Sequence, residues 1–234
     1  MTIPMIRFHA TIRGVRLALT MLLLACCSSA GQQAQVTSKV EFENDRIVVM
    51  RVIIPPGFQS EMHPHAAASL ELFLTDDHIK ETLPDGSAKD WRARAGELAC
   101  IEPVTHRIQN MRSEPTEIIS VEFKGEPMKA CPKVDPQAVR AGVEFENDRV
   151  RITRGKIGPR QSGQMHTHPE YVGIFLTDAM LRAHLSDGTV RELEGKRGFL
   201  RSAAPVTHRI ENLADTPFEA IDINLKPAPN QRKQ

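Results

Sequence analysis

One block of this sequence is written twice, and the duplication limits what the chain can fold into. Val40–Arg46 recurs unchanged as Val143–Arg149, 103 positions later (143 minus 40). One residue is then lost, and Pro103–Ile108 recurs as Pro205–Ile210 at an offset of 102 (205 minus 103). A repeat of about 85 residues is too long for a solenoid unit and has the size of a small domain. We therefore expect two copies of one small domain in tandem.

Within each copy, short alternating runs separated by turns predict β-strands. In the first copy these runs are Arg46–Ile54, Leu70–Leu74, Leu98–Ile101, Arg107–Met111 and Glu117–Phe123. Leu83–Gly86 ends in Asp-Gly, which predicts a tight hairpin turn. No convincing amphipathic helix follows the N-terminal segment. Many short strands joined by tight turns predict an all-β fold, a sandwich or barrel of jelly-roll type.

The repeats and the composition between them set the expected domain boundaries. These are a signal segment at 1–30, a polar tether at 31–39, a first domain at 40–124, a linker at 125–142, a second domain at 143–228 and a tail at 229–234. The linker is rich in proline, and Asp135–Val139 within it could form one helical turn.

The first thirty residues have the pattern of an export signal. Three arginines precede the apolar run Leu17–Cys27, which is too short to span a bilayer as a permanent helix. Ser28–Ala30 fits a signal-peptidase site, whereas Leu23–Cys26 fits a bacterial lipobox, in which Cys26 would be lipidated. We expect an exported protein, either soluble in the periplasm or anchored to the membrane through Cys26. The lipoprotein form is slightly favoured.

Charge and composition exclude some partners. The chain carries 30 basic and 29 acidic residues, a formal charge of +1. Without the three N-terminal arginines, 27 basic residues remain (30 minus 3) and the charge is −2. Nothing in this balance favours nucleic acid or an anionic membrane surface as a partner. With 41% hydrophobic and 25% charged residues, the chain has the composition of a soluble globular protein.

Two cysteines lie outside the signal segment. Cys100 falls in an expected strand and Cys131 in the linker. In an oxidising compartment the two could form a disulfide that ties the linker to the first repeat. A buried free Cys100 with an exposed Cys131 fits the sequence equally well.

Histidines concentrate at matching places in the two copies. Two histidines at i and i+2 on a strand point to the same face, about 6.6 Å apart along the backbone, so both can approach one cation. A third histidine in each copy can complete the set. Of eight histidines after the signal segment, six fall in these two groups: His63, His65 and His106, and His166, His168 and His208. Two such groups rarely arise from packing alone.

The spacing around these histidines resembles the two motifs of the cupin family. Gly57–His65 and Gly163–His168 resemble the first half of its first motif, in which His-x-His follows a glycine. Gly96–Asn110 and Gly198–Asn212 resemble its second motif, glycine followed by Pro-x-x-His-x-x-x-Asn. The whole chain resembles a bicupin, most like small bacterial cupins of poorly defined activity, some of them labelled β-alanine-degradation proteins.

The resemblance implies a jelly-roll barrel of six to eight strands per copy, with a metal in its mouth. The six histidines named above would be the ligands. Imidazole nitrogen suits several divalent metals, so Fe, Zn, Mn and Ni all fit, and ligand type does not choose among them.

One departure from the family pattern bears on chemistry. The position of the family's metal-binding glutamate falls on Ser69 in the first copy and on Tyr171 in the second. Neither side chain replaces a carboxylate ligand, so three neutral histidines leave an open coordination position. This arrangement resembles the three-histidine iron centres of thiol and diketone dioxygenases, and it equally suits a structural zinc site. Glu71 lies on the same strand face as Ser69 and is a candidate ligand or supporting acid.

These observations predict an exported metal-binding bicupin, with a three-histidine Fe(II) dioxygenase-like activity on a small organic substrate. The alternative is a non-catalytic module that binds a small molecule or a metal, and isomerase or lyase chemistry also stays open. Tyr171 is expected to orient a bound species. We expect unequal sites, with the second, around His166 and His168, more suited to metal binding. A homodimer is left open.

Overall fold

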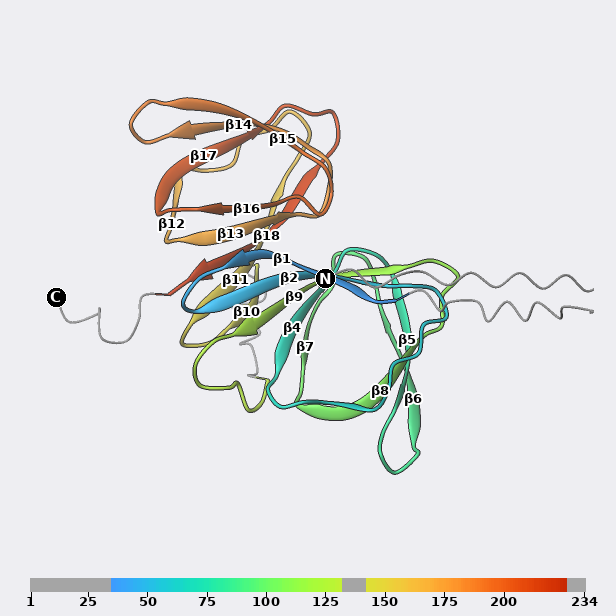
Figure 1. Cartoon of the computed structure of the whole chain (residues 1–234). Helices are drawn as coiled ribbons and strands as arrows, with labels where there is room; N and C mark the ends of the chain where they lie inside the picture. Colours follow the sequence, from blue (N-terminus) through green and yellow to red (C-terminus); the bar gives the residue numbers. More distant parts are fainter. Residues whose placement is uncertain (1–34, 132–141, 227–234) are drawn as a thin grey trace, which may run out of the picture. The chain divides into compact units, whose positions relative to one another are not determined.

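The computed structural model describes residues 35–131 and 142–226, all of which belong to one compact unit, Gln33–Gln234. The predicted signal segment with Cys26, the helical turn predicted at Asp135–Val139 and the predicted tail at 229–234 lie outside the described residues. Within the described part, the secondary structure consists of eighteen β-strands without a helix, which confirms the all-β prediction (Figure 1). It follows that no helix capable of crossing a membrane occurs among these residues.

The first repeat folds into two antiparallel sheets. A five-stranded sheet has the order β1-β2-β9-β4-β7, and a four-stranded sheet has the order β3-β8-β5-β6. The strands are β1 (Thr37–Glu43), β2 (Ile47–Ile54), β3 (His63–His65), β4 (Ser69–Phe73), β5 (Asp77–Thr82), β6 (Ala88–Ala93), β7 (Leu98–Ile101), β8 (Val104–Asn110) and β9 (Thr116–Phe123).

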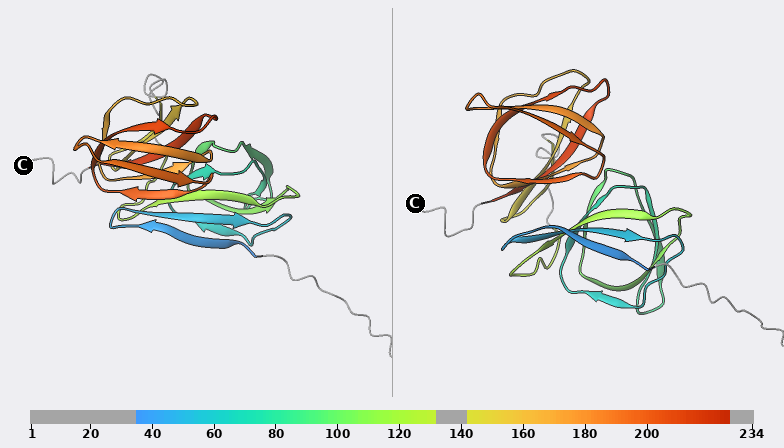
Figure 2. Two further views of the ribbon diagram at one scale, coloured as in Figure 1. Left: turned by 90° about the horizontal axis from the view of Figure 1, so that it is seen from above. Right: turned by 45° about the horizontal axis from the view of Figure 1, so that its top comes forward.

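The second repeat reproduces this topology strand for strand. Its sheets have the orders β10-β11-β18-β13-β16 and β12-β17-β14-β15. The strands are β10 (Val143–Glu146), β11 (Val150–Ile157), β12 (His166–His168), β13 (Tyr171–Phe175), β14 (Ala179–Leu185), β15 (Val190–Gly195), β16 (Leu200–Ala203), β17 (Val206–Asn212) and β18 (Phe218–Leu225). In both repeats the two sheets face each other, as the further views show (Figure 2). The two-domain jelly-roll prediction is confirmed.

Two details differ from the sequence-based expectations. Each repeat has nine strands, where six to eight were expected, because the short histidine segments and the outer strands β1 and β10 also pair. Strand β1 begins at Thr37, inside the segment expected to be a tether. Its register with β2, starting at Thr37↔Ile53, supplies ladder hydrogen bonds to residues whose polar sequence predicted none.

The largest apolar core lies between the two five-stranded sheets, one from each repeat. Alternate residues of β2, such as Ile47 and Val49, are fully buried in it. Ile152 of β11 and Ile221 of β18 belong to the same cluster. Because strand side chains alternate between faces, the opposite faces of these sheets look into the interior of each repeat. The repeats therefore bury their apolar sheet faces against one another and leave their interiors free for a site.

Arg51 joins the edge of this core in the first repeat. Its Nε donates to Glu41 at 2.8 Å, and its other nitrogens contact Glu117 and the Gly198 carbonyl oxygen of the second repeat. The two acids hold the guanidinium in place, so that it reaches across to the backbone of the other repeat.

Arg154 makes the same contacts in the opposite direction. It donates to Glu144 and Glu219, both at 2.7 Å, and to the Gly96 carbonyl oxygen of the first repeat at 2.6 Å. The glycines on both sides have positive φ, 88° at Gly96 and 80° at Gly198, a conformation that turns the chain sharply. The two repeats are thus joined by contacts related by pseudo-two-fold symmetry.

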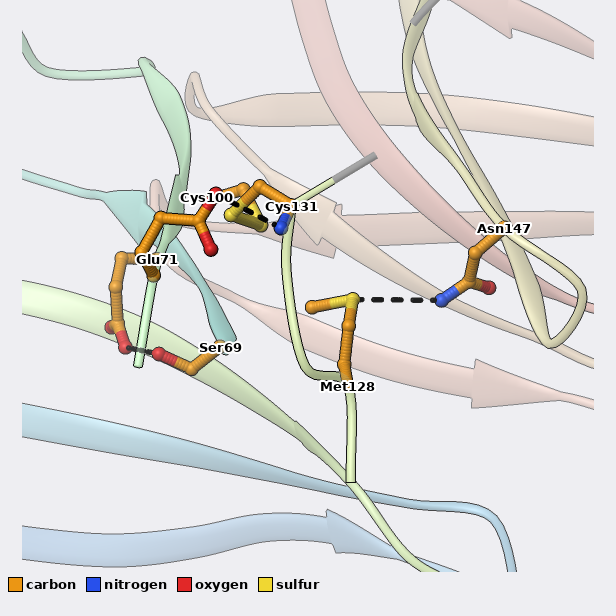
Figure 3. Close-up of a disulfide and its surroundings, with 7 residues drawn as sticks. Ser69, Glu71, Cys100, Met128, Cys131 and Asn147 are labelled. Carbon is orange, nitrogen blue, oxygen red and sulfur yellow. Dashed lines mark hydrogen bonds between the residues drawn. A yellow bond between two sulfur atoms is a disulfide. The ribbon is translucent and has the colours of Figure 1, made fainter. Parts of the chain in front are cut away.

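A disulfide ties the segment after β9 back to the first repeat (Figure 3). Cys131 is bonded to Cys100 on β7, the edge strand of the five-stranded sheet. The backbone N–H of Cys131 also donates to Glu102 Oε1 at 3.1 Å, and the N–H of Ala68 donates to the Met128 carbonyl oxygen at 2.7 Å. Of the two states that the sequence left open for these cysteines, the structure therefore has the disulfide.

Candidate metal centres

In the first repeat, strand register brings three histidines together. His63 and His65 share one face of β3, and His63 is paired directly with His106 of β8. Side chains of directly paired residues lie on the same face of a sheet. One ligand atom from each ring lies within 4.8 Å of the other two. The three predicted ligands of this repeat are therefore brought into one cluster.

The second repeat forms the same cluster with the same register. His166 on β12 is paired with His208 of β17, and His168 lies two residues further along β12. The three ring centroids are 4.7 to 5.2 Å apart. The Nε2 atoms of His166 and His168 approach to 2.9 Å. All six predicted ligands thus fall into two triads.

Hydrogen bonds in the first triad fix which ring nitrogen is free. His63 Nδ1 lies 2.8 Å from the Glu61 carbonyl oxygen, and His106 Nδ1 lies 2.7 Å from Glu81 Oε1. Both partners can only accept, so each Nδ1 carries the proton and leaves Nε2 as a ligand. Glu81 stands in the usual place of an acid that orients a metal-binding histidine.

The second triad is oriented by different groups. His166 Nδ1 donates to the Gln164 carbonyl oxygen at 2.8 Å, and His168 Nδ1 donates to Asn224 Oδ1 at 2.7 Å. The amide of Asn224 is itself fixed, because its Nδ2 donates to the carbonyl oxygens of Arg151 and Asp222, both at 3.1 Å. Again Nε2 is the atom left to bind a metal.

The electrostatic surroundings favour neutral imidazoles. Burial, together with the neighbouring rings of His166 and His168, lowers the pKa of His208 to about 4. Burial and the other two rings of its triad also lower the pKa of His65. A histidine must be neutral to bind a metal, so these rings are ready for ligation at neutral pH. The donor set of each triad therefore fits a divalent metal such as Fe, Zn, Mn or Ni.

Glu71 points into the first repeat but is not one of the clustered ligands. Its Oε1 accepts hydrogen bonds from the hydroxyl groups of Ser69 and Ser120, each at 3.0 Å (Figure 3 shows the first). Burial raises the pKa of Glu71 to about 7, although the two hydroxyl groups oppose the shift. The predicted shared face with Ser69 is confirmed, and the role of Glu71 as a ligand stays a prediction.

The second repeat places a carboxylic acid at the same spot from a different strand. In the first repeat Glu71 of β4 is paired with Ser120 of β9. The equivalent pair in the second repeat is Gly173 of β13 with Asp222 of β18. A Cβ added to Gly173 would lie 3.2 Å from Asp222 Oδ1, so the aspartate occupies space that the glycine leaves. Burial raises the pKa of Asp222 to about 6. Each repeat therefore keeps one buried acid in this row.

Tyr171 lies against the second triad, as its position in the family motif suggested. Its ring stacks on His168 with centroids 4.3 Å apart and planes inclined by 21°. Burial and the nearby Asp222 raise the pKa of Tyr171, so its hydroxyl group stays protonated. The neighbouring Glu170 instead contacts Arg46 and accepts from Asn44 at 3.2 Å, so it is engaged by the first repeat.

Each triad opens into a cavity inside its own repeat. The first cavity has a volume of about 700 Å³ and contains Glu71 and Trp91. The second has a volume of about 560 Å³ and contains Tyr171 and Asp222. Both volumes lie in the range of small-molecule sites, and both walls are mainly apolar. A metal bound by either triad would face a shielded space of substrate size.

Replacing Glu71 with glutamine is expected to change how stability depends on pH. The folded-state pKa of about 7 lies above the usual 4.5, so the folded protein binds the extra proton between these values. Stability is therefore lost as pH rises through this window. The variant lacks this loss. Its free energy of unfolding should exceed that of the parent by about 3 kcal/mol at pH 8, with no such gain at pH 4.5. Urea denaturation of metal-free protein at both pH values measures this.

The matched control for that prediction is Glu102→Gln, between β7 and β8. Glu102 lines the same cavity but is exposed and does not contribute to the raised pKa of Glu71, so its replacement should leave the pH dependence unchanged. Equal pH profiles for the Glu71 variant and the parent would contradict the prediction.

Four residues of these sites were not predicted from the sequence. They are Glu81, which orients His106, Asn224, which orients His168, Asp222 and the cavity-lining Arg201. None belongs to a recognisable motif. The sequence marks these positions by a difference between the two copies. The equivalent residues in the other copy are, in the same order, Ala183, Glu122, Ser120 and Ala99.

Comparison with solved structures bears on the fold. No protein-family model matches the sequence, and no curated protein matches it. Among solved structures, oxalate decarboxylase from Lactobacillus farciminis with formate is 14% identical, with a TM-score of 0.50, over 79% of this chain and 78% of that one. Bacillus subtilis oxalate decarboxylase, whose Mn(II) centres have been studied, is 13% identical, with a TM-score of 0.49, over 81% of this chain and 72% of that one.

A cupin domain from Bordetella pertussis Tohama I is 21% identical over 38% of this chain and 94% of its own length, with a TM-score of 0.35. The oxalate decarboxylase from Lactobacillus farciminis shares the arrangement of two cupin folds in tandem. The chain therefore has the bicupin fold, and each of its two repeats has a three-histidine cluster that can hold a divalent metal ion.

Proposed function

We propose that the second repeat is a metal-dependent oxidoreductase of the dioxygenase type, acting on a small organic substrate. The observation that carries the proposal is a ligand set made only of imidazoles, with Tyr171 where the family has a glutamate ligand. Such a set leaves coordination positions facing the cavity of about 560 Å³. A structural site would instead have its coordination sphere closed by protein.

The residues of this repeat have separate tasks in the proposed reaction. His166, His168 and His208 hold the metal, and Asn224 keeps the His168 ring in the orientation that ligation needs. Tyr171 presents a protonated hydroxyl group that can donate a hydrogen bond to a bound substrate. When bound, ferrous iron would supply O₂ activation and positions for substrate. The apolar wall of the cavity limits the access of water to the reacting groups.

Metal content and oxygen consumption test the proposal. Elemental analysis of the purified protein comes first, followed by loading with Fe(II) and measurement of oxygen uptake over a panel of thiols, phenols and diketones. We expect iron-dependent uptake with at least one class, and loss of uptake in His208→Ala. Full zinc occupancy together with no oxygen uptake over the panel would refute the dioxygenase proposal.

The first repeat supports a second candidate function, a non-catalytic binding module. Its larger cavity, about 700 Å³, has Ser69 in place of Tyr171 and therefore lacks a phenol beside the triad. Under this proposal His106→Ala leaves oxygen uptake intact, whereas His208→Ala abolishes it. Equal loss in both variants would count against a division of labour.

We also propose that the chain is exported from the cytoplasm. The cross-link between Cys100 and Cys131 is of a kind that persists mainly in oxidising compartments. Cell fractionation should therefore find the oxidised protein outside the cytoplasm. Reduced protein confined to the cytosolic fraction would contradict the proposal.

A further inference from the structure

The cavities of the two repeats differ in charge although their scaffolds match. Five acids and one lysine line the first cavity: Glu71, Asp77, Glu81, Glu102, Glu122 and Lys89. Three bases and one acid line the second: Lys156, Arg191, Arg201 and Asp222. Leaving histidines aside, the formal charges are −4 (1 minus 5) and +2 (3 minus 1). The two cavities therefore present opposite formal charges to a ligand.

One row of the second sheet places a cation in this cavity. Arg201 of β16 is paired with Gly173 of β13, which is paired on its other side with Asp222 of β18. Paired side chains share a face, and the neighbouring Leu200 packs on the core between the sheets, so Arg201 points into the cavity. Gly173 has no side chain, and the space it leaves is taken by Asp222, whose Oδ1 lies 3.2 Å from where a Cβ of Gly173 would be.

The same row in the first repeat lacks the cation. Ala99, Glu71 and Ser120 occupy the three places. The first cavity therefore serves as an internal comparison, built on the same topology with a methyl group where the second has a guanidinium.

Arg201 lines the second cavity together with Tyr171 and His208, and it has no counter-ion in the described part of the chain. Within residues 35–131 and 142–226, no hydrogen bond or ion pair involves its guanidinium. Lys156, by contrast, is paired with Glu219 at 3.3 Å. The guanidinium of Arg201 is thus half-buried and unpaired, near a triad suited to a cation. A negatively charged ligand in this cavity would compensate these positive charges.

We propose that the second cavity binds a small organic carboxylate, held through Arg201 with its organic part between Tyr171 and the triad. The planar fork of a guanidinium matches a carboxylate, and such paired hydrogen bonds are among the strongest available to a side chain. This inference rests on the proposed function for its reactive metal. The binding itself needs no catalysis and is tested without it.

The sequence supplies a spectroscopic reporter for each cavity. The chain has one tyrosine, Tyr171, which lines the second cavity, and one tryptophan, Trp91, which lines the first. Protein labelled with fluorotyrosine and fluorotryptophan therefore gives one ¹⁹F resonance per cavity. Benzoate and benzamide serve as probes because they differ chiefly in charge. Titrations of metal-free protein then show which cavity each probe enters.

Benzoate is expected to shift the Tyr171 resonance saturably and to bind at least about 10-fold more tightly than benzamide. Arg201→Ala should weaken benzoate binding by about 10-fold or more and leave benzamide binding unchanged, which also shows that the cavity remains folded. Arg201→Lys should recover part of the loss, because lysine keeps the charge without the fork. The control Arg191→Ala, at an exposed position of the same cavity, should change benzoate binding little.

The first cavity gives the converse test. Benzoate should leave the Trp91 resonance unchanged, because this cavity has a formal charge of −4 and has Ala99 in the place of Arg201. Equal affinity for benzoate and benzamide in the parent, no response at Tyr171, or an unchanged benzoate affinity in Arg201→Ala would each overturn the proposal. Absence of iron-dependent oxygen uptake in a protein that still prefers benzoate to benzamide would refute the proposed function alone. Oxygen uptake and benzoate binding are measured independently.

Discussion

Replacing His208 with alanine is expected to remove metal binding from the second repeat while leaving the first repeat able to bind. The remaining pair, His166 and His168, would hold a divalent ion with two nitrogens instead of three. Loss of groups that merely orient a ligand already costs about 10- to 100-fold in metal affinity, so loss of a ligand should cost more than about 100-fold. Calorimetric titration with Zn²⁺ or Mn²⁺, followed by elemental analysis after dialysis, measures the stoichiometry of each variant.

Two further variants make this result specific. His106→Ala should remove binding from the first repeat alone, and the double variant should bind at neither site. His184, which lies outside both triads and contacts Glu211 at 2.8 Å, provides the control, and its replacement should leave stoichiometry unchanged. Retention of the parent stoichiometry in the double variant would rule out the triads as metal sites. The relative affinities of the two sites test the expectation that the second is the better one.

Removal of the Cys100–Cys131 disulfide has the second-largest expected effect. The bond spans 31 positions and restricts the unfolded chain, which corresponds to about 4 kcal/mol of stability in the loop-entropy model. For a chain of this size the midpoint of thermal unfolding should fall by about 10 °C. Thermal unfolding of Cys100→Ser/Cys131→Ser and of the parent, with and without reductant, measures the effect.

Serine is the matched replacement in that experiment, because the second repeat has Ser202 at the place equivalent to Cys100. The strand itself therefore tolerates the change. The reductant should lower the midpoint of the parent and leave that of the double variant unchanged. A parent that is insensitive to reductant, once reduction is verified by thiol counting, would contradict the expectation.

The sequence predicts the fold well because its information is repeated. The copied Val40–Arg46 block and the histidine motifs define the two domains, and strand alternation then places His63 and His65 on one face. The antiparallel register then sets His106 directly across from His63. Strands such as β5 and β6 were harder to predict, since their charged residues lack clear alternation and their pairing depends on partners distant in sequence.

The groups around the triads could not be predicted from local patterns. Glu81 reaches His106 from a strand 25 residues away in sequence, and Asn224 reaches His168 across 56 residues. Asp222 takes over the place of Glu71 from a different strand, which becomes visible only when the register of the sheets is known. Predicting which residues are cross-strand neighbours, and therefore what chemistry they support, requires the tertiary structure.

The reciprocal contacts of Arg51 and Arg154 have a consequence for how this protein can change over time. Each reaches a glycine carbonyl oxygen of the opposite repeat, as equivalent residues do across the axis of a symmetric dimer. In a dimer of identical subunits every substitution alters both sites at once. Here the two halves are encoded separately yet held at the high effective concentration of a single chain. The cavity of one half can therefore change without the other, as Arg201 and Asp222 in the second repeat differ from Ala99 and Ser120 in the first.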